Sequence, residues 1–177
     1  MKVNKEAIIS NYIAILGFAH RCPERNKAIA LKTGQKIASL GFGIAAGNLF
    51  GTPKHAFKGA KQNQGLTLAI IEQAQHFYGH QYCDILEIVP TVSIKHNMLA
   101  ELCCGAIVIG GGSGTLKLVQ HFLAQKKPVV VIKNTNGVAG NKLRQTTLHR
   151  KVKRYPDLDS AIHQQIKFWA PSLQQCG

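Results

Sequence analysis

The chain has 177 residues, 45% of them hydrophobic, and this size and composition fit one globular domain with a buried core rather than a disordered chain. Its formal net charge of +14, from 22 Lys and Arg against 8 Asp and Glu, favours anionic partners such as nucleotides, nucleic acid or acidic surfaces. No stretch approaches the ~18 uninterrupted apolar residues of a membrane span, and the N-terminal segment has no signal-peptide pattern, so we expect a cytoplasmic protein with no membrane partner.

Short apolar runs bounded by turn residues alternate with helical patterns along the chain. This alternation is typical of a parallel sheet with crossover helices. The predicted strands are 12–17, 43–46, 66–71, 84–89, 106–109 and 128–132. The predicted helices are 23–40, 53–63, 92–104, 115–125 and 157–169. We therefore predict the α/β class, with a single doubly wound, mostly parallel sheet of the Rossmann-like type and helices on both faces.

We expect one domain over residues 1–177, with its core at about 12–132 and a basic C-terminal extension at 133–177. The predicted strand order resembles 3-2-1-4-5. In such a sheet, ligands bind outside the carboxyl ends of the strands, at the point where the strand order reverses. The glycine-rich turns that follow the strands are therefore the first candidates for a functional site.

One such turn lies in GAIVIGGGSGTLKLV, residues 105–119. Three consecutive glycines allow a sharp bend and let a phosphate approach bare backbone amides, while the following helix N-terminus adds partial positive charge. The spacing is neither G-x-G-x-x-G nor a Walker A loop. The alternative is that the glycines only permit tight strand-to-helix packing. The candidate phosphate-binding residues are Gly110, Gly111, Gly112, Ser113, Gly114 and Thr115.

A second strand-glycine-helix turn lies in AAGNLFGTPKHAFKGAKQNQG, residues 45–65. Gly47, Asn48 and Gly51 can supply a backbone cradle, and Thr52 can cap the helix that follows. Both turns follow predicted strands, and we expect them to face one crevice at the carboxyl ends of the strands. We therefore predict that they form one ligand site.

These two segments resemble the SLOG superfamily of Rossmann-like nucleotide-binding proteins, over residues 12–132. The superfamily includes the lonely-guy (LOG) phosphoribohydrolases, the molybdenum-cofactor carrier proteins and DNA-processing protein A. Residues 111–115 resemble the Pro-Gly-Gly-x-Gly-Thr loop, and residues 47–65 resemble an earlier glycine-rich region. The resemblance implies a bound nucleotide or sugar phosphate, with its phosphate on 111–115, and a homo-oligomer, commonly a dimer.

Three positions depart from the phosphoribohydrolase pattern. Leu118 stands where the hydrolases have the Glu that acts as acid and base, and leucine cannot transfer a proton. Lys95 is the nearest match to a family Arg, and it could contact a phosphate as a point charge. Gly105 replaces an acidic residue. We therefore predict a nucleotide- or phosphate-ligand-binding protein without the standard hydrolase activity.

Two other functions stay open from the sequence. One is a nucleotide N-glycosidic hydrolase that uses other acid and base groups, for which the candidates are Glu101, His96 and His121. The structural alternative for Glu101 is a solvated face paired with Lys95 or Asn97, and for His121 it is a partly buried helix position.

The other open function is nucleic-acid binding. Between residues 133 and 154 there are seven cations and no Asp or Glu. These side chains could follow a phosphate backbone, although Tyr155 is the only nearby aromatic residue for base stacking. The alternative, which we favour, is an edge strand whose cations deter pairing with another sheet. The cations are Lys133, Lys142, Arg144, Arg150, Lys151, Lys153 and Arg154.

Five cysteines form an odd set without zinc-site spacing, which indicates reduced thiols. Cys103 and Cys104 are adjacent at a predicted helix end, where neighbouring side chains point in directions too different to share a metal ion. We predict no metal site and no cofactor other than a nucleotide ligand.

Overall fold

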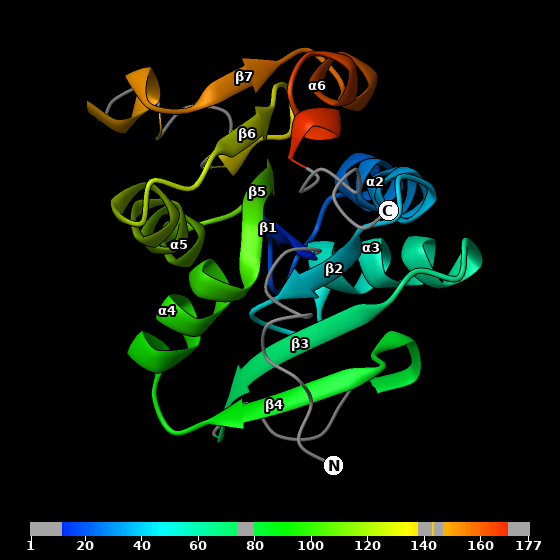
Figure 1. Cartoon of the computed structure of the whole chain (residues 1–177), viewed down its shortest axis with the longest axis vertical. Coiled ribbons are helices and arrows are strands. Elements are labelled where there is room, and N and C mark those ends of the chain that lie inside the picture. The colour runs from blue at the N-terminus through cyan, green and yellow to red at the C-terminus, as the bar shows by residue number, and fades with distance from the viewer. Residues whose placement is uncertain (1–11, 74–79, 138–142, 144–146, 170–177) are drawn as a thin grey trace, which may run out of the picture.

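The computed structural model describes residues 12–73, 80–137, 143 and 147–169 (Figure 1). Within them the chain forms one all-parallel sheet of seven strands in the order β4-β3-β2-β1-β5-β6-β7. The strands are β1 Tyr12–Gly17, β2 Gly43–Ala46, β3 Thr67–Glu72, β4 Ile85–Val89, β5 Cys103–Ile109, β6 Val129–Ile132 and β7 Lys153–Tyr155. The α-helices are α2 Glu24–Ser39, α3 Gly51–Gln62, α4 Val92–Leu102, α5 Ser113–Ala124 and α6 Leu158–Gln164.

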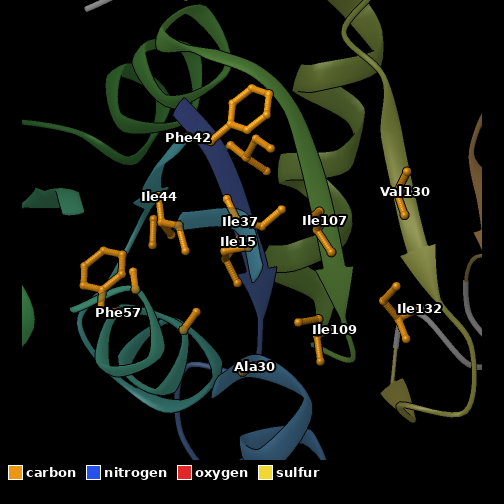
Figure 2. Close-up of a cluster of buried hydrophobic side chains, with 14 of the residues drawn as sticks. Ile15, Ala30, Ile37, Phe42, Ile44, Phe57, Ile107, Ile109, Val130 and Ile132 are labelled. Atoms are coloured by element: carbon orange, nitrogen blue, oxygen red, sulfur yellow. The ribbon is translucent and has the colours of Figure 1, made fainter. Parts of the chain in front are cut away.

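Helices cover both faces of the sheet, as predicted. Alternate residues of β1 point to opposite faces, because side chains in a strand have a period of two. Ile13 and Ile15 join a core under α2, α3 and α6, whereas Ala14 and Leu16 join a core under α4 and α5. Figure 2 shows the first of these cores, with Ile107 and Ile109 of β5 beside the residues of β1 and β2. The central strands are thus buried on both sides.

The predicted strand order was wrong in one respect. The fourth strand does not lie beside β1 but pairs with β3 at one edge of the sheet, and β5 takes the place next to β1. Helix α4 then returns from β4 to β5 and packs against β3 and β1 on the way (Figure 1). The apolar pattern identifies strands, but it does not say which edge of the sheet a strand joins. The strand order therefore reverses between β1 and β5.

Several predicted boundaries also move. Helix α3 begins at Gly51, two residues before Pro53, and α4 ends at Leu102 rather than at 104. The last predicted helix, 157–169, is interrupted at Gln165 and continues as a 3-10 turn, Ile166–Phe168. Two further 3-10 turns are His80–Tyr82 and Thr147–Arg150. No helix within the described ranges is long and apolar enough to cross a membrane.

The basic segment near the C-terminus forms β7, which pairs with β6 at the edge of the sheet. The prediction of an edge strand is therefore confirmed. Lys153 is exposed on this strand and Tyr155 is buried.

Helices α2 and α3 pack with their backbones in contact through two glycines. A Cβ at Gly34 would lie 1.9 Å from the carbonyl oxygen of Ala56, and a Cβ at Gly59 would lie 2.0 Å from that of Leu31. No side chain larger than hydrogen fits at either position. This contact fixes the spacing between α2 and α3.

The adjacent cysteines, Cys103 and Cys104, begin β5. The prediction that they lie at the end of a helix is therefore wrong. Strand geometry sends them to opposite faces: Cys103 is buried in the core under α4 and α5, and the Cys104 thiol donates a hydrogen bond to the Tyr12 carbonyl, with Sγ and O 3.1 Å apart. Burial raises the pKa of Cys104 to about 11 and that of Cys103 well above its usual value. Both thiols are therefore protonated and unreactive at neutral pH. Cys176 lies outside the described residues.

Candidate phosphate-binding pocket

A pocket of about 370 Å³ opens at the carboxyl ends of β1 and β5, where the strand order reverses. It brings together seven of the predicted binding residues, from the two glycine turns and from α4. It also contains Gly17, at the end of β1, and three residues of the segment that follows. The described lining consists of Gly17, Phe18, Ala19, His20, Gly47, Asn48, Lys95, His96, Gly112, Ser113, Gly114, Thr115 and Leu118.

The turn after β5 is shaped by its first two glycines. Gly110 and Gly111 have φ angles of +71° and +103°, in the region that favours glycine. The Gly110 amide donates to Thr135 Oγ1 at 3.0 Å, and the Thr115 hydroxyl donates to the Gly17 carbonyl at 3.0 Å. Both glycines bend the chain from β5 into α5, and neither lines the pocket.

The N-terminus of α5 presents free backbone donors to the pocket. Its N-cap is Gly112, which offers no capping side chain, and the first helical hydrogen bond runs from the Leu116 amide to the Gly112 carbonyl. Among the described residues, the amides of Ser113, Gly114 and Thr115 therefore have no acceptor. Such donors, together with the helix dipole, form a site for an anionic oxygen.

Of the four glycines that line the pocket, the fold requires only Gly17, where a Cβ would lie 2.6 Å from the Ile109 carbonyl oxygen. Gly112 has a φ of −113°, and neither Gly112 nor Gly114 has a positive φ. A Cβ at either position would meet no atom within 4 Å. At Gly47, a Cβ would make only ordinary contacts, 3.8 Å from atoms of Leu99 and Lys95. The missing side chains keep the approach to the α5 amides open.

Lys95 lies in the first turn of α4 and brings a buried cation to the pocket, since the residue is only 6% exposed. Its Nζ is 3.7 Å from Oε1 of Glu72, the last residue of β3, and it makes no hydrogen bond within the described residues. Glu72 is not among the residues predicted from the sequence. An acidic residue at the carboxyl end of a predicted strand was the signal that could have found it.

Of the three candidate acid and base groups, His96 and His121 lie side by side, whereas Glu101 lies apart from them. His96 lines the pocket, and burial lowers its pKa to about 4, helped by the positive charge of Lys95, so that it is neutral at pH 7. The His121 ring packs edge-on to that of His96, with centroids 5.2 Å apart, and its Nδ1 lies 2.9 Å from Asn97 Oδ1. Glu101 lines a different hollow, between α4 and α5, and Glu72 is the acidic residue that pairs with Lys95.

Leu118, the residue in place of the hydrolase Glu, does face the pocket. The described lining contains no Asp or Glu. Gly105, at the third departure from the hydrolase pattern, lies within β5, where a Cβ would come within 2.7 Å of the Trp169 ring. Within the described lining, no carboxylate would therefore repel an anion.

The second glycine turn divides between the pocket and the fold. Gly47 and Asn48 line the pocket. The Thr52 amide donates to the Phe18 carbonyl at 2.8 Å, and Thr52 Oγ1 accepts from the Phe18 amide at 3.0 Å. Gly51 has a φ of +53°, and a Cβ there would lie 2.0 Å from the Phe18 carbonyl oxygen. Gly51 and Thr52 thus tie α3 to the loop after β1.

The basic segment lies away from this pocket. Arg150, Lys151 and Lys153 are exposed beside and on β7. Lys133 lines a separate hollow with Arg25 and Lys32 of α2. Lys142 and Arg144 lie outside the described residues.

The family comparison matches residues 10–159 to the SLOG cluster4 family. The chain belongs to this family. This SLOG cluster4 protein is 27% identical over 134 residues to an uncharacterized protein of Archaeoglobus fulgidus. The aligned region covers 76% of this chain and 87% of the relative.

Solved structures share the Rossmann-like fold of this SLOG protein. The structure of TM1055 has a TM-score of 0.76 at 17% identity, covering 86% of this chain and 96% of the other. The molybdenum cofactor binding protein of Rippkaea orientalis has a TM-score of 0.75 at 23% identity, covering 87% and 94%. DNA processing protein A of Helicobacter pylori, which binds single-stranded DNA, has a TM-score of 0.69 at 16% identity, covering 91% and 82%. At these identities the likeness shows the fold.

Proposed function

We propose that the protein binds a nucleotide or related phosphate ligand, with the phosphate on the free amides of Ser113, Gly114 and Thr115. The observation that carries the proposal is the pair Gly112 and Gly114: the fold needs glycine at neither position, yet both leave the helix N-terminus open to the pocket. Gly114 lies within α5, where glycine costs stability relative to alanine. A ligand that must come close to the backbone accounts for that cost.

The charges around the pocket support the same ligand class. Lys95 adds a buried cation to the partial positive charge of the helix end, and the described lining holds no carboxylate that would repel an anion. The molybdenum cofactor binding protein shares the fold and binds a small molecule, which is consistent with a ligand-binding role. Leu118 in the pocket argues for binding without the phosphoribohydrolase reaction.

A thermal-shift titration tests this function. The protein is titrated with nucleoside mono-, di- and triphosphates, and with the corresponding unphosphorylated nucleosides as controls. A phosphorylated ligand at 100 times its dissociation constant should add about 2.7 kcal/mol to the free energy of unfolding, whereas nucleosides should add much less. If no phosphorylated compound stabilises a protein shown to be folded, the proposal is wrong.

Nucleic-acid binding is the second candidate, supported by the exposed cations at β7 and the net charge of +14. DNA processing protein A has the same fold, but at 16% sequence identity the likeness does not extend beyond the fold. Each phosphate that the protein neutralises would steepen the dependence of binding on salt.

The test is retention of single-stranded DNA in a filter assay over a range of salt concentrations. Changing Arg150, Lys151, Lys153 and Arg154 to Gln should weaken retention and flatten its salt dependence. The matched control changes four exposed cations elsewhere to Gln, namely Lys32, Lys58, Lys117 and Lys126, and should have a smaller effect. Retention that survives the quadruple change would remove β7 and its neighbours as the binding surface.

A further inference from the structure

The segment after β1 places an aromatic ring beside the phosphate site. His20 is exposed, and it lines the same pocket as the N-terminus of α5. Its ring stacks on that of Phe50, from the turn before α3, with centroids 5.8 Å apart and an interplanar angle of 28°. Within the part of the chain that the structure describes, the imidazole takes part in no hydrogen bond or ion pair. Stacking is therefore the contact that orients this ring.

The two segments that carry the rings are held together by the backbone. Phe18 and Thr52 exchange two hydrogen bonds, one in each direction, two residues from His20 and two residues from Phe50. The Phe50 amide also donates to Asn48 Oδ1 at 2.9 Å. The stacked pair is therefore preorganised, so a ligand that uses it need not pay for ordering the two loops.

Phe18, a second aromatic residue of the pocket lining, is engaged with the fold, and His96, the third, is buried. A Cβ at Gly110 would lie 2.4 Å from Phe18 Cε2, and a Cβ at Gly137 would lie 3.0 Å from Phe18 Cζ. Its ring therefore packs into the glycine turn and forms part of the wall. Of the aromatic rings in the described lining, this leaves His20 as the exposed one next to the phosphate site.

We infer that the His20 ring, supported by Phe50, is the surface on which a planar heteroaromatic ring of the ligand stacks. His20 thereby selects ring-bearing phosphates, such as nucleoside monophosphates, over plain sugar phosphates. This inference rests on the proposed phosphate site. Offset stacking of aromatic rings is favourable, and it is tolerant of base identity because every base has a π-face. The pocket, at about 370 Å³, falls within the usual size range of small-ligand sites.

The experiment compares three probes on three proteins. Adenosine monophosphate, ribose 5-phosphate and inorganic phosphate are titrated calorimetrically into the wild type, His20→Ala and His20→Phe. His20 is exposed and unbonded, so both variants should unfold at the wild-type midpoint. That measurement is made first.

The wild type should bind adenosine monophosphate about ten-fold more tightly than ribose 5-phosphate or better. His20→Ala should remove most of that preference and leave ribose 5-phosphate binding unchanged, while His20→Phe should keep the preference, since a ring remains. Equal wild-type affinity for both phosphates, or a preference that survives in His20→Ala, would overturn the inference and leave the phosphate site intact. If none of the three probes binds, the phosphate site itself is refuted, and this inference with it.

Discussion

At the scale of single residues, the glycines of this protein divide into two kinds, and a Cβ tells them apart. At Gly34 an added carbon would overlap the Ala56 carbonyl oxygen, whereas at Gly114 it would meet nothing. Both positions are helical. The same substitution should therefore have opposite effects on stability at the two sites.

We predict that Gly114→Ala raises the free energy of unfolding of the ligand-free protein by about 0.5–1 kcal/mol, because alanine loses less backbone entropy on folding. Gly34→Ala should lower it by about 2 kcal/mol or more, because α2 and α3 would have to separate. Urea unfolding of both variants and the wild type measures the two effects. A loss of stability in Gly114→Ala would show that this glycine serves the fold, which would contradict its assignment to a ligand.

His96 should make stability depend on pH. Its pKa is lowered to about 4 in the folded protein, chiefly by burial, from an ordinary value of 6.5. The unfolded chain therefore binds the proton more readily between these two values. The contribution of the neutral ring to the free energy of unfolding is fully present above pH 6.5 and is lost as the pH falls towards 4. Over this whole range the loss amounts to about 3 kcal/mol.

Urea unfolding at pH 7, 5.5 and 4.5 tests this dependence in the wild type and in His96→Asn. The carboxylates that titrate in acid are common to both proteins, so the difference between them isolates His96. The variant should lose less stability on acidification. Parallel curves for the two proteins would show that His96 is not held neutral.

At the scale of the elements, the sequence predicted the strands well, and the site less completely. The bounds of β1 and β2 agree with the prediction, because turn residues flank each apolar run closely. Gly51 and Thr52 were predicted as binding residues, but in the structure both are occupied with Phe18. Residue type alone could not separate a glycine that a ligand needs from one that a neighbouring backbone needs.

Two residues of the site region, His20 and Glu72, were not predicted from the sequence. His20 and Glu72 reach the pocket region from the ends of β1 and β3, and neither lies in a glycine motif. Their contribution depends on which strands are neighbours and on how α3 and α4 sit over the strand ends. These are long-range properties that a local pattern does not contain.

At the scale of the whole molecule, the topology determines where the pocket lies. The predicted class, a doubly wound sheet with both faces covered, is the one observed, and only the place of β4 differs. The site still lies where the strand order reverses, because β5 takes the place beside β1 that the prediction gave to the fourth strand. The crevice therefore forms at the carboxyl ends of β1 and β5.

The central claim is that a phosphate ligand binds at the N-terminus of α5. Calorimetric titration of wild type, Gly114→Ala and Gln120→Ala, with whichever nucleotide stabilises the protein most, tests it directly. Gln120 is exposed on the same helix and does not line the pocket. We predict wild-type affinity for Gln120→Ala and a loss of about ten-fold or more for Gly114→Ala, whose methyl group would stand between the phosphate and the free amides. Equal affinity in all three proteins would contradict the claim.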